Sequence, residues 1–168
     1  YAPAESRPAL LGLLALDTRL SGIVRNSHEP MLAQLRLAWW REALMGSISG
    51  DPLLALLAQW PGAREALTGL VAGWEGMTGT APLPPDAFLA LAEVRGGGFA
   101  ALAEAGAPRG AALRLGRNWA LADIAAHLSH PAEHKAALDL ARAQDWRGEA
   151  LPRALRPLAV LHGLAARE

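Results

Sequence analysis

The sequence predicts an all-α protein, a compact bundle of about eight helices in a single domain spanning residues 1–168. Apolar residues make up 52% of the chain, mostly as Leu and Ala, two residues that favour helices. Ile and Val are few, so β-strands are poorly supported. The apolar residues recur at helical spacing between segments rich in Pro and Gly. A chain of this length can bury a substantial core.

The first two predicted helices have contrasting patterns. The first, Pro8 to Val24, opens on a proline, which suits a first helical turn because its missing N–H has no partner there anyway. The second, Glu29 to Leu44, contains the pair Trp39 and Trp40. It is apolar over most of its circumference, so we expect it to lie in the middle of the domain, covered on several sides.

Six further helices follow from the same periodicity. Their expected ranges are Asp51 to Trp60, Ala63 to Glu75, Asp86 to Ala105, Ala111 to His127, Pro131 to Trp146 and Leu151 to Ala166. The stretch GMTGTAPLPP, residues 76–85, is the clearest loop. Three consecutive glycines, Gly96 to Gly98, interrupt the fifth helix and predict either a kink or a close helix–helix approach.

Composition excludes several classes of function. The 16 basic and 16 acidic residues give a formal net charge of zero, so nothing favours nucleic-acid binding. The chain has no cysteine, which excludes disulfides and thiolate metal sites. No apolar run approaches the roughly 20 residues of a membrane span, and no signal peptide is visible. We expect a cytoplasmic location, with peripheral attachment to a membrane as an open alternative.

Two stretches near the N-terminus resemble a known family. YAPAESRPALLGLLALDTRLSGIV and EPMLAQLRLAWWREAL are similar to the N-terminal part of the squalene/phytoene synthase family, whose members join prenyl diphosphates head to head. The pair Trp40–Arg41 matches the family's tryptophan-arginine pair. The double tryptophan after EPM looks most like the branch with the mitochondrial complex I assembly factor and its bacterial relatives. LGRNWALADIAAHL and LPRALRPLAVL are weaker matches to later family helices.

The resemblance implies a truncated, isoprenoid-synthase-like orthogonal bundle with a central cavity. Active members carry two DxxxD-type motifs on facing helices, and these aspartates hold the Mg²⁺ ions that bind the diphosphate. Here Ser21 and Arg25 stand at the two aspartate positions of the first motif. Asp123 stands at the asparagine position of the second motif, and His127 replaces its aspartate. The metal-binding pattern is therefore missing from both helices.

The carboxylates elsewhere in the chain do not replace the lost motifs. Among the 16 acidic residues, only Asp145 and Glu149 lie four positions apart. We therefore expect a non-catalytic family member without metal or cofactor, which binds an isoprenoid-like or other apolar ligand, or acts in assembly through a protein partner. The alternative is an active prenyltransferase of isoprenoid biosynthesis that condenses prenyl diphosphates with Mg²⁺. Local signatures of serine hydrolases and of phosphate-binding loops are absent.

Six residues are candidates for binding a ligand: Ser21, Arg25, Arg36, Trp40, Asp123 and His127. The two arginines could hold a diphosphate or another anion without metal, although surface exposure or a structural ion pair is the simpler interpretation. For Trp39, core packing is favoured over a cavity wall or a partner surface, whereas for Trp40 these interpretations are nearly equally supported.

Histidines near the end of the sixth predicted helix form a second cluster with Asp123. His127, His130 and His134 are close to it in sequence, but Pro131 separates the last of them from that helix. We interpret these histidines as solvated or capping groups rather than metal ligands. The decisive question is whether the side chains at the two former motifs converge on one apolar cavity. Convergence would mean that a ligand site is retained in altered form.

Overall fold

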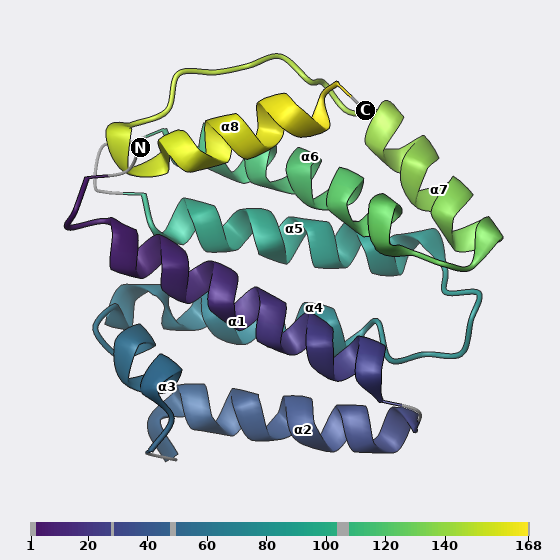
Figure 1. Ribbon diagram of the computed structural model, residues 1–168, viewed down its shortest axis with the longest axis horizontal. Helices are drawn as coiled ribbons and strands as arrows, with labels where there is room; N and C mark the ends of the chain where they lie inside the picture. Colours follow the sequence, from purple (N-terminus) through teal and green to yellow (C-terminus); the bar gives the residue numbers. More distant parts are fainter. Residues whose placement is uncertain (1–2, 28, 48–49, 104–107, 168) are drawn as a thin grey trace.

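The structure is a computed structural model that describes residues 3–27, 29–47, 50–103 and 108–167. Within these ranges it contains eight α-helices and no strand, which confirms the predicted all-α class (Figure 1). The helices are α1 (Arg7–Asn26), α2 (Pro30–Glu42), α3 (Pro52–Leu57), α4 (Arg64–Glu75), α5 (Pro85–Ala101), α6 (Arg109–His127), α7 (Pro131–Arg142) and α8 (Arg156–Ala165). No helix in these ranges is both long enough and apolar enough to cross a membrane.

Some helix boundaries agree with the sequence-based expectation and others differ. Helix α3 begins as predicted, because Oδ1 of Asp51 accepts a hydrogen bond of 2.8 Å from the N–H of Leu53 and caps the first turn. Helix α7 ends before Trp146, whose indole N–H folds back to donate to the carbonyl of Ala141 at 2.8 Å. The predicted end of the fifth helix, Ala105, lies outside the described residues.

Helices α5 and α6 form the centre of the bundle. They pack on each other more extensively than any other pair. Helices α7 and α8 cover α6, whereas α1 and α4 pack against α5 (Figure 1). Helix α2 packs on α1 and α4, and α3 packs on α1. Both form the outer edge of the molecule in this view.

The glycine run permits the close approach of α5 and α6. Helix α5 continues through it without a break, so of the two predicted outcomes the close approach is confirmed. A Cβ on Gly96 would lie 2.6 Å from the carbonyl oxygen of Leu113 and 2.8 Å from the amide nitrogen of Arg117. On the other helix, a Cβ on Gly116 would lie 2.9 Å from Cα of Gly96. Backbone therefore packs directly on backbone at this crossing.

Helix α2 lies at the edge of the bundle, so the prediction that it would lie in the middle was wrong. Its inward face consists of Ala33, Leu37 and Trp40. The opposite face is exposed and apolar, with Met31, Leu32, Leu35 and Trp39. Trp40 is 4% exposed and Trp39 is 39% exposed, the reverse of the preference for Trp39 as the core residue. Periodicity identifies apolar faces but does not tell how many of them a neighbour covers.

Candidate functional site

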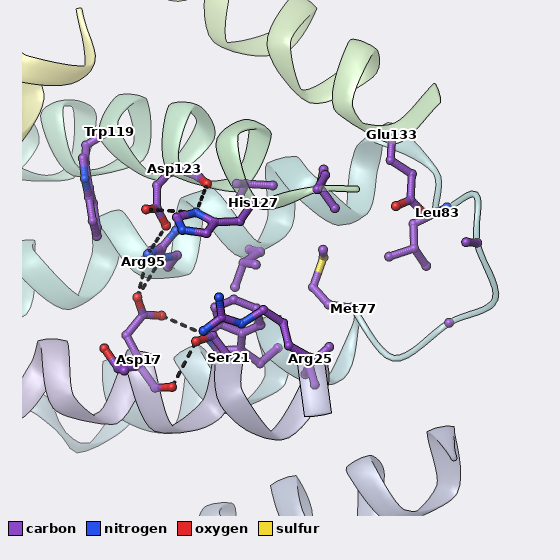
Figure 2. A pocket seen from close by; sticks show the side chains of 18 of the residues that line it. Asp17, Ser21, Arg25, Met77, Leu83, Arg95, Trp119, Asp123, His127 and Glu133 are labelled. Carbon is purple, nitrogen blue, oxygen red and sulfur yellow. Dashed lines mark hydrogen bonds and ion pairs between the residues drawn. The ribbon is translucent and has the colours of Figure 1, made fainter. Parts of the chain in front are cut away.

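A cavity of about 430 Å³ opens between α1, α4, α5 and α6 (Figure 2). The loop between α4 and α5 and the start of α7 complete its wall. Most of the wall is apolar, and its side chains include Leu14, Val24, Met77, Leu91, Ile124 and Leu128. Such a combination of apolar walls and a few polar groups is typical of sites for small molecules.

Four of the six sequence-predicted candidates line this cavity. Ser21 and Arg25 reach it from α1, and Asp123 and His127 reach it from α6 on the facing side (Figure 2). Within each pair the residues are four positions apart, so they share one face of their helix. The two pairs of side chains that the sequence analysis singled out therefore converge on one largely apolar cavity.

The other two candidates do not line the cavity, because α2 does not border it. Arg36 is exposed and lines a separate open groove between α1 and the start of α3. Trp40 is buried in the core. Its ring makes an edge-to-face contact with Trp39 at 5.2 Å between ring centres, and the guanidinium of Arg19 lies 5.8 Å from its centre. Arg41 next to it pairs with Glu75 on α4 at 2.8 Å.

The inner end of the cavity holds a charged cluster that the sequence interpretation missed. Nη2 of Arg95, on α5, lies 2.7 Å from Oδ2 of Asp17 and 2.8 Å from Oδ2 of Asp123. Nε of Arg95 donates a further bond of 3.0 Å to Asp17, and the indole N–H of Trp74 donates to the other oxygen of that carboxylate at 2.8 Å. The arginine side chain is only 5% exposed.

Two tryptophan rings lie close to the guanidinium of Arg95. The guanidinium carbon of Arg95 lies 4.5 Å from the ring centre of Trp119 and 5.9 Å from that of Trp74. A cation above an aromatic face is attracted to the ring's electron density, more strongly where water is excluded. Trp119 is itself in edge-to-face contact with Phe99, at 5.6 Å between ring centres. The cluster is therefore packed into the core as well as charge-paired.

A signal for this cluster was present in the sequence. Arg95 lies on the same apolar face of its helix as Phe88 and Leu91, and Asp17 lies among the buried leucines of α1. A charged residue on an apolar face needs a partner of opposite charge, because burying an unpaired charge is costly. The pairing itself joins residues 78 positions apart, so only the tertiary structure reveals it.

Polar groups also surround the mouth of the cavity. Nδ1 of His127 lies 2.7 Å from the backbone carbonyl of Asp123, to which it can donate, and 3.5 Å from the carboxylate of the same residue. The hydroxyl of Ser21 donates to the carbonyl of Thr18 at 3.0 Å. Arg25 is exposed, and no ion pair to it is found among the described residues. Its cationic group is thus available to a ligand.

The loop between α4 and α5 is tied in place as a wall of the cavity. Buried Glu133, in the first turn of α7, accepts a hydrogen bond of 2.7 Å from the N–H of Leu83. At the other end of the loop, Oγ of Thr78 accepts a bond of 3.2 Å from the side-chain amide of Gln34 on α2. Both ends of this irregular segment are therefore anchored to helices.

The side chains at this site do not fit the magnesium ions that the family resemblance associates with catalysis. Mg²⁺ requires about six oxygen ligands at roughly 2.0–2.1 Å. Asp17 and Asp123 already bind Arg95, and Glu133 binds a backbone amide. The described part of the chain contains no group of three or more His, Asp or Glu side chains that could hold a metal ion. His134 is turned away to the carbonyl of Ala125, at 2.8 Å.

Comparisons with protein-family models, with curated proteins and with solved structures gave no match. The likeness to squalene/phytoene synthases therefore rests on the residues of the sequence, and membership of that family stays a prediction.

Proposed function

We propose that this protein binds an apolar, isoprenoid-like molecule in the cavity between α1 and α6 and does not catalyse prenyl transfer. The observation that carries this proposal is a largely apolar cavity whose facing carboxylates, Asp17 and Asp123, are already paired with Arg95. Its volume of about 430 Å³ falls within the range of small-molecule sites. The resemblance to squalene/phytoene synthases is the reason for choosing an isoprenoid.

Arg25 extends the proposal to the polar end of a ligand. It lines the cavity at its exposed side and has no carboxylate partner among the described residues. A guanidinium can bind a phosphate or carboxylate through paired, charge-assisted hydrogen bonds without any metal ion. An isoprenoid with an anionic end would therefore place its chain in the cavity and its charge beside Arg25.

Isothermal titration calorimetry with farnesol and farnesyl diphosphate, in buffer containing EDTA, tests this proposal. We expect both compounds to bind the wild-type protein, because burial of the apolar chain is the main driving force. Ser21→Trp places a large ring in the cavity and should abolish binding of both. Ala15→Trp adds the same ring to an exposed position of α1 outside this cavity and should leave binding unchanged. Absence of binding to the wild type would contradict the proposal.

A second assay separates binding from catalysis. Purified protein is incubated with farnesyl and geranylgeranyl diphosphates and Mg²⁺, and the organic extract is searched for condensed products. We expect none, because the carboxylates that would hold Mg²⁺ are engaged by Arg95. Product formation that EDTA abolishes would instead establish the alternative, an active prenyltransferase.

The sequence also predicts a second role for a non-catalytic protein, assembly through a protein partner. One observation favours it, the exposed apolar face of α2 with Leu35 and Trp39. Ligand binding and partner binding can be tested separately, because the exposed face of α2 does not border the cavity. Leu35→Glu should leave the titration with farnesol unchanged.

A further inference from the structure

Arg95 has the position of a cation shared between two helices. A single nitrogen, Nη2, contacts Asp17 on α1 at 2.7 Å and Asp123 on α6 at 2.8 Å, and Figure 2 shows the three side chains meeting at the inner end of the cavity. Asp17 is 11% exposed and Asp123 is 31% exposed. Two carboxylates this close, with so little water around them, repel each other unless a cation lies between them.

We infer that the guanidinium of Arg95 permanently occupies the place at which Asp17 and Asp123 would otherwise share a divalent metal ion. The arginine is thus a positioning residue, which joins α1 to α6 and keeps the cavity open and charge-balanced without metal. The inference concerns the cavity of the proposed function but requires no ligand. Its test and the ligand titrations can therefore fail independently of each other.

The surroundings of Arg95 favour a guanidinium over a metal ion. The second oxygen of Asp17 accepts the indole N–H of Trp74, so one of its lone pairs is already engaged. The faces of Trp119 and Trp74, at 4.5 and 5.9 Å, offer no oxygen ligands. A planar, weakly hydrated guanidinium stacks well on such rings, whereas Mg²⁺ gives up its water reluctantly. The contacts of Trp74 and Trp119 thus favour the same cation, a guanidinium.

Removal of the guanidinium should create a metal site. In Arg95→Ala, the carboxylates of Asp17 and Asp123 would face each other beside a cavity that water and ions can enter. A divalent ion placed between them restores the charge balance and supplies its remaining ligands as water. The variant should therefore acquire a response to metal ions that the wild-type protein lacks. A side chain with a merely structural role would not produce this gain when removed.

Thermal unfolding measured by circular dichroism tests the inference. Wild-type protein should show the same Tm, within about 1 °C, in EDTA, in Mg²⁺ and in Mn²⁺ at matched ionic strength. Arg95→Ala should unfold about 10 °C lower in EDTA, because it leaves buried Asp17 and partly exposed Asp123 side by side without a cation. Addition of about 10 mM Mn²⁺ should recover about 3 °C or more, as should methylguanidinium at the same concentration.

Two further variants show whether the rise in Tm with Mn²⁺ depends on the carboxylates of Asp17 and Asp123. Arg95→Ala combined with Asp123→Asn should lose the Mn²⁺ response. Arg41→Ala removes an arginine from an exposed ion pair with Glu75 and should neither lower Tm comparably nor gain a metal response.

Two results would overturn the inference. One is an Arg95→Ala protein that folds but ignores both Mn²⁺ and methylguanidinium. The other is a rise in wild-type Tm with Mg²⁺ or Mn²⁺ that disappears in Asp123→Asn, since a metal ion would then bind while Arg95 is present. Where Arg95→Ala does not fold, the wild type and Asp123→Asn decide the matter, because a wild type without this metal response supports the inference.

Discussion

Asp17 and Arg95, 78 residues apart in the sequence, form a buried ion pair in which Nε and Nη2 of the arginine both donate to one carboxylate oxygen, at 3.0 and 2.7 Å. The pair connects α1 to α5, and the contact of Arg95 with Asp123 extends the connection to α6. These are three of the helices that surround the cavity. The shape of the candidate site therefore depends on one cluster of charges.

Neutralising Asp17 should destabilise the protein far more than neutralising Asp123. Asp17 is 11% exposed and also accepts the indole N–H of Trp74, whereas Asp123 is 31% exposed. Asp17→Asn should cost about 3 kcal/mol, because it removes the more buried of the two carboxylates, which accepts two bonds from Arg95 and one from Trp74. Asp123→Asn should cost roughly 1 kcal/mol, because Arg95 keeps its other carboxylate. Urea denaturation of the two variants measures the difference, and equal losses would contradict the described geometry.

Substitution by alanine should lower the stability of the protein at Gly96 and raise it at the neighbouring Gly97. A Cβ at position 96 would lie 2.6 Å from a backbone carbonyl of α6, so Gly96→Ala should cost roughly 2 kcal/mol or more. At position 97 nothing lies within 4 Å of the added Cβ. Gly97→Ala should therefore stabilise the helix by about 1 kcal/mol, through its better helix propensity. Thermal melts of both variants, compared with wild type, check this prediction.

The two faces of α2 should differ sharply in their contribution to stability. Leu37 is fully buried, and Leu37→Ala should cost about 2–5 kcal/mol. Leu35 is 61% exposed, and Leu35→Ala should change the free energy of unfolding by no more than about 0.5 kcal/mol. The same chemical change at two sites of one helix controls for helix propensity. A large loss at Leu35 in chemical denaturation would show that its face is covered.

Release of Glu133 should loosen the loop that walls the cavity. Its carboxylate accepts the N–H of Leu83, and a hydrogen bond to a charged group contributes about 1.5–3 kcal/mol. Glu133→Ala should therefore speed hydrogen exchange at the Leu83 amide by roughly tenfold or more. Glu93→Ala, at an exposed residue of α5, is the control and should leave that amide unchanged. Exchange is followed amide by amide with NMR spectroscopy.

Acid should weaken the docking of α8 through His162. Burial, together with the nearby charge of Arg114, lowers the pKa of this histidine below its ordinary value of 6.5. The unfolded chain then binds the proton more readily than the folded one. Stability is therefore complete above pH 6.5 and decreases as the pH falls from 6.5 toward the lowered folded-state pKa.

His162→Phe isolates this effect, because phenylalanine keeps a ring against Trp146 but cannot be protonated. The imidazole and indole rings lie 5.1 Å apart between centres, and Nε2 of His162 has no hydrogen-bond partner in the described part of the chain. The free energy of unfolding, measured in urea from pH 7.5 to 5.5, should fall less steeply in this variant. Identical slopes for variant and wild type would rule out His162 as the titrating group.

Local chemistry in the sequence was sufficient to predict the helices. The Asp51–Pro52 start of α3 and the alternation of leucine stripes with Pro- and Gly-rich segments predict elements that the structure contains. The same local pattern placed Ser21 with Arg25, and Asp123 with His127, on two helix faces that line one cavity. Such predictions succeed because i, i+4 spacing and capping depend only on residues within a few positions of each other.

Only the tertiary structure decided what those faces meet. Trp39 and Trp40 are adjacent in an apolar helix, yet one is exposed and the other buried, because the described helices pack against only one side of α2. Arg95 and Asp17 each look anomalous on an apolar helix face until folding brings them together. The sequence by itself determined the all-α class, the positions of the helices in the described residues, and the helix faces that four candidate residues share. The pairing of buried charges and the burial of apolar helix faces depend on contacts between segments that are distant in the sequence. The same contacts create the cavity.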